Sequence, residues 1–379
     1  MAVAPTVTED PLNALIDGTL QQLDITQEMH QSAVAEYQRV ALHLSAAGAA
    51  DGIDVYVHPQ GSFLLGTGVL PMGRDQFDID LVCRYNLVSA QTTRPLLKQR
   101  AGAALGEYLS LTKGDPTGPT DLKECARAWT LLYTQRFFHL DVLPAIRDDG
   151  ASSPTAILLP DRDLAHWQHS DPLGFAAWFV QRTQPAMVLK AAEAYVAGVP
   201  HYTVRTVLHR IVQVLKRHRD LYFRDDMDNR PPSILLTTLA ALAYEGNTNI
   251  YSGVIDVANH VYDYIESRAG VWWLPNPVAE SENFVDKWNK HHVRRMRFDA
   301  WLGSLVAEVE VVRKQNLAMA TKQLQGLFGE EPVNKAAARV GTEYRELRGR
   351  GALSIGGPAA TLTTGVGTRV REHTFYGTR

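Results

Sequence analysis

The segment FDIDLVCRY at residues 77–85 constrains the fold of this chain more than any other feature, because apolar and polar residues alternate along its first half. Alternation with a period of two is typical of a β-strand whose two faces meet different surroundings. Phe77 and Ile79 then point into a core. Asp78 and Asp80 lie side by side on the opposite face. Adjacent carboxylates repel unless cations neutralise them, so the segment predicts either a site for hard divalent ions or the solvated face of an amphipathic strand.

A glycine-rich turn, GSFLLGTGVLPMG, precedes this segment and begins with Gly61 and Ser62. The run IDVYVHPQ before the turn alternates as well, which predicts a strand ending where the turn begins. Glycine lets a backbone approach a phosphate closely, and backbone N–H groups together with a hydroxyl can bind phosphate oxygens. Gly61 and Ser62 are therefore candidate phosphate-binding residues, with a plain structural turn as the alternative.

A third aspartate, Asp141, lies in the strand-like run FFHLDVLPAI, on the face opposite Leu140 and Val142. A third carboxylate near the first two would complete a two-metal site and help to deprotonate an attacking hydroxyl. Taken alone, Asp141 would be read as an edge-strand or turn residue. The occurrence of all three features in this order, within about eighty residues, favours the catalytic interpretation.

The order of the predicted elements indicates an α+β fold. Residues 1–165 are expected to hold N-terminal helices and a catalytic core, and residues 166–328 a helical lobe. In that lobe strand-like alternation stops, and four or five amphipathic helices are expected from about residue 172, the clearest at 204–220. Residues 329–379 lose hydrophobic periodicity and are rich in glycine and threonine near their end, which predicts a flexible tail.

Composition narrows the class of protein. A chain of 379 residues with 45% hydrophobic content can bury one large core or two modest ones. The formal net charge of -3 excludes a wholesale polyanion binder but not a local basic cleft. Its two cysteines, Cys83 and Cys125, fit neither a disulfide framework nor a zinc site. With no secretory signal and no apolar run long enough to span a bilayer, we expect a cytoplasmic protein without a membrane partner.

The order of the motifs resembles the signature of polymerase-beta-like nucleotidyltransferases: a Gly-Ser pair, two aspartates on the next strand and a third aspartate further on. The gap from Ser62 to Asp78 is longer than the general pattern expects. The longer form, with Gly66, Thr67 and Pro71 inside the gap, resembles the CD-NTases of anti-phage CBASS systems, the bacterial relatives of cyclic GMP–AMP synthase. The segments HLDVLPAIRDDG, NRPPSILLTTLAA and LPNPVAESENFVDKW are similar to the same group, so the resemblance covers roughly residues 50–300.

The resemblance implies a fold and a reaction. The fold would be a polymerase-beta-like core, with a mixed sheet and helices, facing a C-terminal helical lobe across a central cleft. Asp78, Asp80 and Asp141 would hold two Mg²⁺ ions, which Mn²⁺ can replace. A 2′- or 3′-hydroxyl would attack the α-phosphate of a nucleoside triphosphate and pyrophosphate would leave. A second bond would close the ring of a cyclic di- or trinucleotide, a second messenger in anti-phage defence.

The resemblance also implies binding residues outside the acidic motifs. Lys216 and Ser233 match the lysine and serine of the helical lobe that contact the donor triphosphate, with ATP expected among the substrates. The alternatives are a solvated helix face for Lys216 and a helix N-cap for Ser233. Gly377, in the terminal segment FYG, resembles an end to which ubiquitin-conjugation-like partner enzymes couple the synthase. Thr378 and Arg379 follow it, and an inert end is the alternative.

Two other functions use the same motifs. A template-independent RNA-tailing nucleotidyltransferase would need a strongly basic path for RNA, and the near-neutral charge argues against one. A catalytically inactive nucleotide- or RNA-binding module would be expected to lack at least one carboxylate, and all three are present. We therefore expect an enzyme that requires no nucleic acid.

Overall fold

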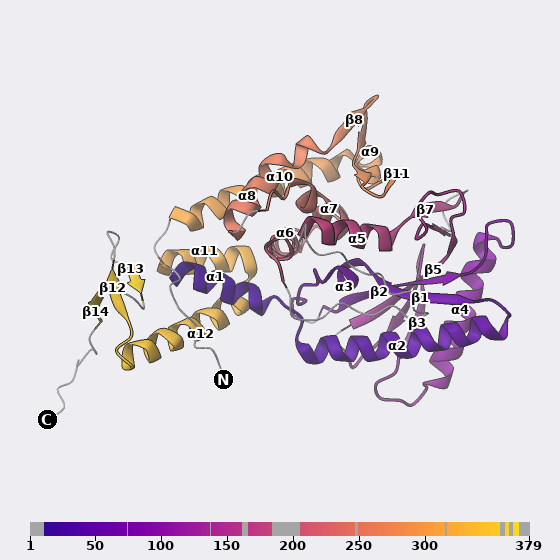
Figure 1. Ribbon diagram of the computed structural model, residues 1–379, viewed down its shortest axis with the longest axis horizontal. Coiled ribbons are helices and arrows are strands. Elements are labelled where there is room, and N and C mark those ends of the chain that lie inside the picture. The colour runs from indigo at the N-terminus through magenta and orange to yellow at the C-terminus, as the bar shows by residue number, and fades with distance from the viewer. Residues whose placement is uncertain are drawn as a thin grey trace. The chain divides into compact units, whose positions relative to one another are not determined.

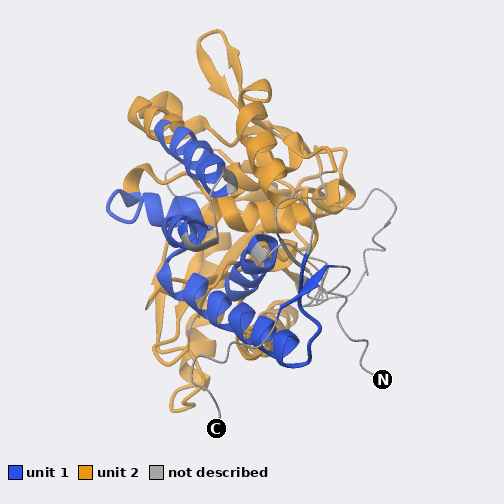
Figure 2. Cartoon of the chain, turned by 90° about the vertical axis from the view of Figure 1, so that its left-hand side faces the viewer, with its two compact units in different colours: residues 1–24, 217–227, 300–379 blue, residues 25–216, 228–299 orange. Residues whose placement is uncertain are grey.

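The chain forms two compact units in the computed structural model (Figure 2). Unit 1 comprises residues 1–24, 217–227 and 300–379, and unit 2 comprises residues 25–216 and 228–299. Two α-helices, α6 (Val207–Tyr222) and α10 (His292–Lys314), contribute residues to both units. The structure describes residues 11–73, 75–136, 138–160, 166–183, 205–246, 249–314, 317–356, 361–363 and 367–370.

Unit 2 is built around a mixed sheet, which contains seven strands among the described residues (Figure 1). The strands follow the order β1-β2-β5-β4-β3, and β6 and β7 extend the sheet from β5. Strands β2 and β5 run parallel, and the other pairs are antiparallel. The bounds are β1 Val55–Gln60, β2 Phe77–Tyr85, β3 Asp121–Glu124, β4 Trp129–Leu132, β5 Phe138–Arg147, β6 Ile157–Leu159 and β7 Gln168–Ser170.

Helices α2 (Gln27–Ala50) and α4 (Arg94–Leu111) pack on one face of this sheet. The shared core contains Ile79 and Leu81 of β2 together with Leu140 of β5, all fully buried. Thr26 is the N-cap of α2, and its hydroxyl accepts a hydrogen bond from Met29 N at 3.2 Å. Because the apolar residues of β2 fill this face, its aspartates lie on the other.

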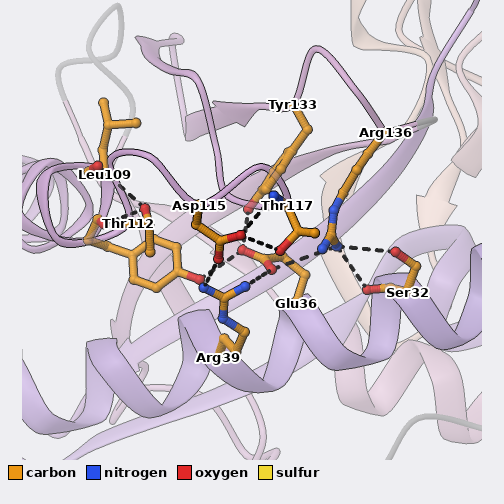
Figure 3. Close-up of polar contacts among 10 residues, drawn as sticks. Ser32, Glu36, Arg39, Leu109, Thr112, Asp115, Thr117, Tyr133 and Arg136 are labelled. Atoms are coloured by element: carbon orange, nitrogen blue, oxygen red, sulfur yellow. Dashed lines mark hydrogen bonds and ion pairs between the residues drawn. The ribbon is translucent and has the colours of Figure 1, made fainter.

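A buried carboxylate joins these helices to the sheet (Figure 3). Glu36 of α2 is fully buried, and its Oε1 accepts hydrogen bonds from the hydroxyls of Tyr108 at 2.8 Å and Tyr133 at 2.9 Å. Its Oε2 lies 3.2 Å from Arg39 Nη1 and 3.7 Å from Arg136 Nη1. A buried charge is costly unless it is paired and hydrogen-bonded. The four partners of Glu36 meet that requirement and hold α2, α4 and the end of β4 in place.

The remainder of unit 2 is mainly helical but contains short strands that the sequence did not predict. Residues 266–283 form two small hairpins, β8–β9 and β10–β11, so the expected run of helices is interrupted there. Their strands are two to five residues long, too short to show alternation. The bounds are α3 Gly61–Leu65, α5 Pro172–Thr183, α7 Ser233–Ala243, α8 Ile250–His260, α9 Asp286–Lys290, β8 Glu266–Arg268, β9 Val271–Trp273, β10 Pro275–Asn276 and β11 Ala279–Asn283, with 3₁₀ turns at Met227–Asn229 and Val261–Asp263.

Unit 1 contains part of the segment that the sequence assigned to a flexible tail. Residues 330–349 form helix α12, which buries Val333, Ala336 and Val340 and packs against α1. These three apolar residues give only a narrow stripe in a strongly polar helix, which explains the apparent loss of periodicity. The bounds are α1 Pro11–Gln22, α11 Leu317–Phe328, α12 Glu330–Gly349, β12 Ser354–Gly356, β13 Thr361–Thr363 and β14 Thr368–Arg369. In the part of the chain that the structure describes, no helix is both long and apolar enough to cross a membrane.

Candidate active site

The pairing of β2 with β5 brings the predicted acidic residues together. The two strands run parallel, with Asp80 opposite Asp141 and Asp78 opposite His139. Neighbouring strands lie about 4.8 Å apart, and residues two apart share a face. The three aspartates therefore project from the same face of two adjacent strands. Asp78 and Asp141 are 63 positions apart in the sequence (141 minus 78).

Asp78, Asp80 and Asp141 form an acidic cluster whose negative charge nearby cations do not fully offset. Burial, followed by the charges of Asp78 and Asp141, raises the pKa of Asp80 from 3.8 to about 7. Burial also raises the pKa of Asp141, although a hydrogen bond from Thr130 opposes the effect. That bond runs from Thr130 Oγ1 on β4 to Asp141 Oδ1 at 2.6 Å, and it fixes the orientation of the carboxylate. A group of carboxylates held together against their own repulsion is a donor set that suits a hard divalent cation.

His139 pairs with Asp78 and carries a positive charge when it is protonated. Its Nε2 lies 3.0 Å from Asp78 Oδ1, and the hydrogen bond to Asp78 raises the pKa of His139. Asp78 itself remains exposed, with 61% of its side chain accessible, so it can also meet a ligand from solvent. Among the described residues, no three His, Cys, Asp or Glu side chains are placed so that they could together hold a metal ion. The strand register sets the three aspartates on one face, and their side chains would have to turn toward a cation to bind it.

The Gly-Ser turn lies against the acidic cluster. Strand β1 ends at Gln60, opposite Asp80 of β2, and helix α3 starts at the next residue. Gly61 has φ of 59°, a left-handed conformation that L side chains rarely adopt. A Cβ atom at this position would lie 2.4 Å from Asp80 Oδ2, so only glycine leaves room for the carboxylate. Ser62 is the second residue of α3 and directly follows the glycine that lies against Asp80.

Lys216 also acts on this cluster, from helix α6. Its side chain is buried, with 4% of the residue exposed, which excludes a solvated helix face. Its Nζ donates to the backbone oxygen of Thr67 at 3.1 Å and to Thr67 Oγ1 at 3.2 Å. The positive charge of Lys216 is near enough to Asp80 to lower its pKa against the larger effect of burial. The lysine thus lies between the glycine-rich turn and the carboxylates.

The other predicted site residues have weaker structural support. Ser233 is the first residue of α7, and Pro232 is the N-cap, so Ser233 is not the cap that sequence offered as an alternative. Its backbone oxygen accepts a hydrogen bond from Thr237 Oγ1 at 2.9 Å. Contact of Ser233 with a triphosphate stays a prediction. Gly377 lies outside the described residues.

Two polar residues at the site were missed by the sequence interpretation. His139 has the same strand parity as Asp141, two positions before it, and that parity was a signal in the sequence. Thr130 gave no such signal, because its strand β4 was not predicted and its partner depends on the pairing of β4 with β5.

Similarity to known proteins indicates the family of this chain. No family model matches the chain. A c-di-GMP synthase of Roseivirga ehrenbergii is 29% identical over 343 residues, covering 86% of each chain. The cyclic dinucleotide synthase CdnG of Bradyrhizobium diazoefficiens is 24% identical over 410 aligned positions, covering 98% of this chain and 95% of that protein. The solved structure of the Bradyrhizobium CD-NTase CdnG in complex with GTP matches with a TM-score of 0.70 at 22% identity, covering 88% of this chain and 100% of that one.

The chain is a bacterial CD-NTase. Vibrio cholerae DncV, a cyclic AMP-GMP synthase, shares the fold with a TM-score of 0.64 at 13% identity, covering 85% of this chain and 96% of that structure. The predicted nucleotidyltransferase core with a mixed sheet and helices is confirmed. The CD-NTase is accordingly an enzyme of the nucleotidyltransferase class, as its sequence predicted.

Proposed function

We propose that this CD-NTase joins nucleoside triphosphates into a cyclic dinucleotide and releases pyrophosphate. The parallel register of β2 and β5 carries the proposal, because it sets Asp80 opposite Asp141 beside the Gly-Ser turn. One relative is named as a c-di-GMP synthase, and another is solved with GTP bound. GTP is therefore the first substrate to test and a guanosine dinucleotide the first product. The expectations of ATP as a substrate and of a trinucleotide ring stay open.

The three aspartates are proposed as the metal ligands. Asp78, Asp80 and Asp141 would hold two Mg²⁺ ions, and the burial and mutual repulsion that raise the pKa of Asp80 support this. When bound, such ions stabilise the charge on the attacking and leaving oxygens of a phosphoryl transfer. Asp141 is the proposed proton acceptor for the attacking 2′- or 3′-hydroxyl. Burial raises its pKa toward the range useful for a base, and Thr130 holds its orientation.

The glycine-rich turn and α6 are the proposed binding elements for the triphosphate. Helix α3 starts at Gly61, which lies against Asp80, and Ser62 is the next residue, so the hydroxyl of Ser62 and the backbone at the start of α3 would meet phosphate oxygens next to the metal ligands. Lys216 supplies a buried ammonium group whose charge acts on Asp80. Ser233 is retained as a second contact from the helical half.

The cellular role of the enzyme and the coupling of its C-terminal segment are also proposed. We propose that the enzyme acts in the cytoplasm, in anti-phage defence, because its family resemblance is to synthases of CBASS systems. We also retain Gly377 as a site for coupling to a ubiquitin-conjugation-like enzyme. Incubation with such an enzyme and ATP, followed by intact-mass analysis of wild type and a Gly377→Pro variant, tests the coupling.

An RNA-tailing enzyme is the alternative that uses the same carboxylates. To separate the two, the purified protein is incubated with GTP and Mg²⁺, with and without a single-stranded RNA bearing a free 3′-hydroxyl. The proposal expects pyrophosphate release that does not depend on the RNA, and an RNA of unchanged length. Pyrophosphate release only with RNA, together with a lengthened RNA, would favour the tailing enzyme. The Asp80→Asn variant is the inactive control for both reactions.

A further inference from the structure

One face of helix α6 holds the backbone of residues 65–68, which we call the phosphate turn. His209, Gln213 and Lys216 are spaced by four and three positions, so they lie on the same side of the helix. Each donates a hydrogen bond to a backbone oxygen of the turn. The bonds run from His209 Nε2 to Leu65 O at 3.1 Å, from Gln213 Nε2 to Gly68 O at 2.9 Å and from Lys216 Nζ to Thr67 O at 3.1 Å.

His209 is held in the form that makes this bond. The backbone N–H of Thr206 donates to His209 Nδ1 at 3.3 Å, and the Thr206 hydroxyl lies 2.7 Å from the same nitrogen. Since Nδ1 accepts, the ring proton is on Nε2, where it faces the Leu65 oxygen. Burial, assisted by the charge of Arg205, lowers the pKa of His209 to about 4. The neutral ring therefore keeps this arrangement across the neutral pH range.

Gln213 is fixed in the same way. It is fully buried, and its Oε1 accepts a hydrogen bond from Arg210 Nη1 at 2.8 Å. The amide nitrogen is thereby turned toward Gly68 O. Loss of a donor to a buried carbonyl leaves that carbonyl unsatisfied, which is unfavourable.

Thr67 links the phosphate turn to the proposed phosphate contacts. Its backbone N–H donates to Ser62 O at 3.1 Å, and its own oxygens accept from Lys216. Leu65 and Gly68, the residues held by His209 and Gln213, flank Thr67 on both sides. Restraining the two flanks therefore fixes Thr67, and with it the spacing between Ser62 and the Lys216 ammonium.

We propose that His209 and Gln213 are positioning residues, which hold the phosphate turn so that Ser62 and Lys216 face the same phosphate group. This inference rests on the proposed function and deepens it. It assigns a role in triphosphate binding to two residues of α6 outside the three aspartates and the Gly-Ser turn.

The test compares binding of a triphosphate and of its monophosphate. The probes are a nonhydrolysable GTP analogue and GMP, each titrated with Mg²⁺ into wild type and variants, alongside KM and kcat for GTP. His209→Met and Gln213→Met remove the donors at similar side-chain length. His209→Gln places an N–H donor close to the position of Nε2. Val212→Ala, a buried neighbour on α6, is the control for a general loss of stability.

The proposal expects each methionine variant to raise the triphosphate Kd and the KM roughly tenfold, the size typical of one lost hydrogen bond with an unsatisfied partner. The GMP Kd should stay within twofold, His209→Gln should recover most of the loss, and Val212→Ala should bind as wild type. Should the methionine variants fail to fold, Thr206→Val, which unlocks the His209 ring, is expected to raise the triphosphate Kd severalfold.

Unchanged triphosphate affinity in folded variants would overturn the positioning role and leave the proposed function intact. An equal loss for GMP and triphosphate would also overturn it, because that pattern indicates general disorder of the site. If wild type bound no nucleoside triphosphate when all four were tried, the proposed function would fail and this inference with it.

Discussion

Replacement of Asp80 by asparagine should abolish catalysis and yet stabilise the protein. The folded state raises the pKa of Asp80 from 3.8 to about 7, so keeping this group ionised opposes folding. At 1.36 kcal/mol per pKa unit, a shift of about three units corresponds to at most about 4 kcal/mol. The side chain is only partly buried, and solvent screens part of the repulsion. We therefore expect Asp80→Asn to raise the free energy of unfolding of unit 2 by ~2 kcal/mol at a pH at which Asp80 of the wild type is ionised.

The pH dependence of this gain follows from the direction of the shift. Between about pH 4 and pH 7 the folded state binds the Asp80 proton and the unfolded state has released it, so wild-type stability falls as pH rises. The loss is complete above the folded pKa. Asparagine does not titrate, so the advantage of Asp80→Asn should be small near pH 4.5 and full at pH 8.

The assay is urea unfolding at both pH values in the presence of EDTA, with wild type, Asp80→Asn and the exposed Asp75→Asn as control. Adding Mg²⁺ at pH 8 should stabilise wild type and leave Asp80→Asn nearly unchanged, since a ligand that binds only the folded state raises its stability. The reasoning is refuted if Asp80→Asn is no more stable than wild type at pH 8, or if its gain is equal at the two pH values.

Three further predictions concern neighbouring residues. Gly61→Ala should cost roughly 1–2 kcal/mol in urea unfolding, because of its left-handed φ, and should lower kcat by displacing Asp80; wild-type kcat would contradict the close approach. Lys216→Met should raise the KM for GTP about tenfold or more through loss of a charged phosphate contact, and an unchanged KM for every triphosphate would count against its role. Tyr133→Phe should lower the free energy of unfolding by about 1 kcal/mol by removing one hydrogen bond to buried Glu36, with kcat preserved; no change in stability would contradict that contact.

The parts of the fold that the sequence predicted are those with long regular patterns. Strand β2 matches the predicted segment because its alternation reflects one face in the core and one face carrying carboxylates. The β8–β11 hairpins were missed because strands of two to five residues carry almost no periodic signal. Helix α12 was missed because only three residues on one stripe are buried in a polar segment.

The candidate site was predicted in part for a similar reason. Strand parity predicted that Asp78 and Asp80 share a face, but it did not predict the parallel register that sets Asp80 opposite Asp141. The bond between Thr130 and Asp141 depends on a strand that had no sequence signal. The bonds from α6 to the phosphate turn join positions more than 140 residues apart, so they arise from tertiary packing alone.

Mass spectrometry of the product tests the central claim most directly. The protein is incubated with GTP, with ATP, and with all four triphosphates in Mg²⁺ or Mn²⁺, and the mixture is then treated with phosphatase. We predict a phosphatase-resistant cyclic dinucleotide from wild type, with GTP alone sufficient, and none from Asp80→Asn or Asp141→Asn. Wild-type product that is fully degraded to nucleosides, or cyclic product that persists in both aspartate variants, would contradict the account.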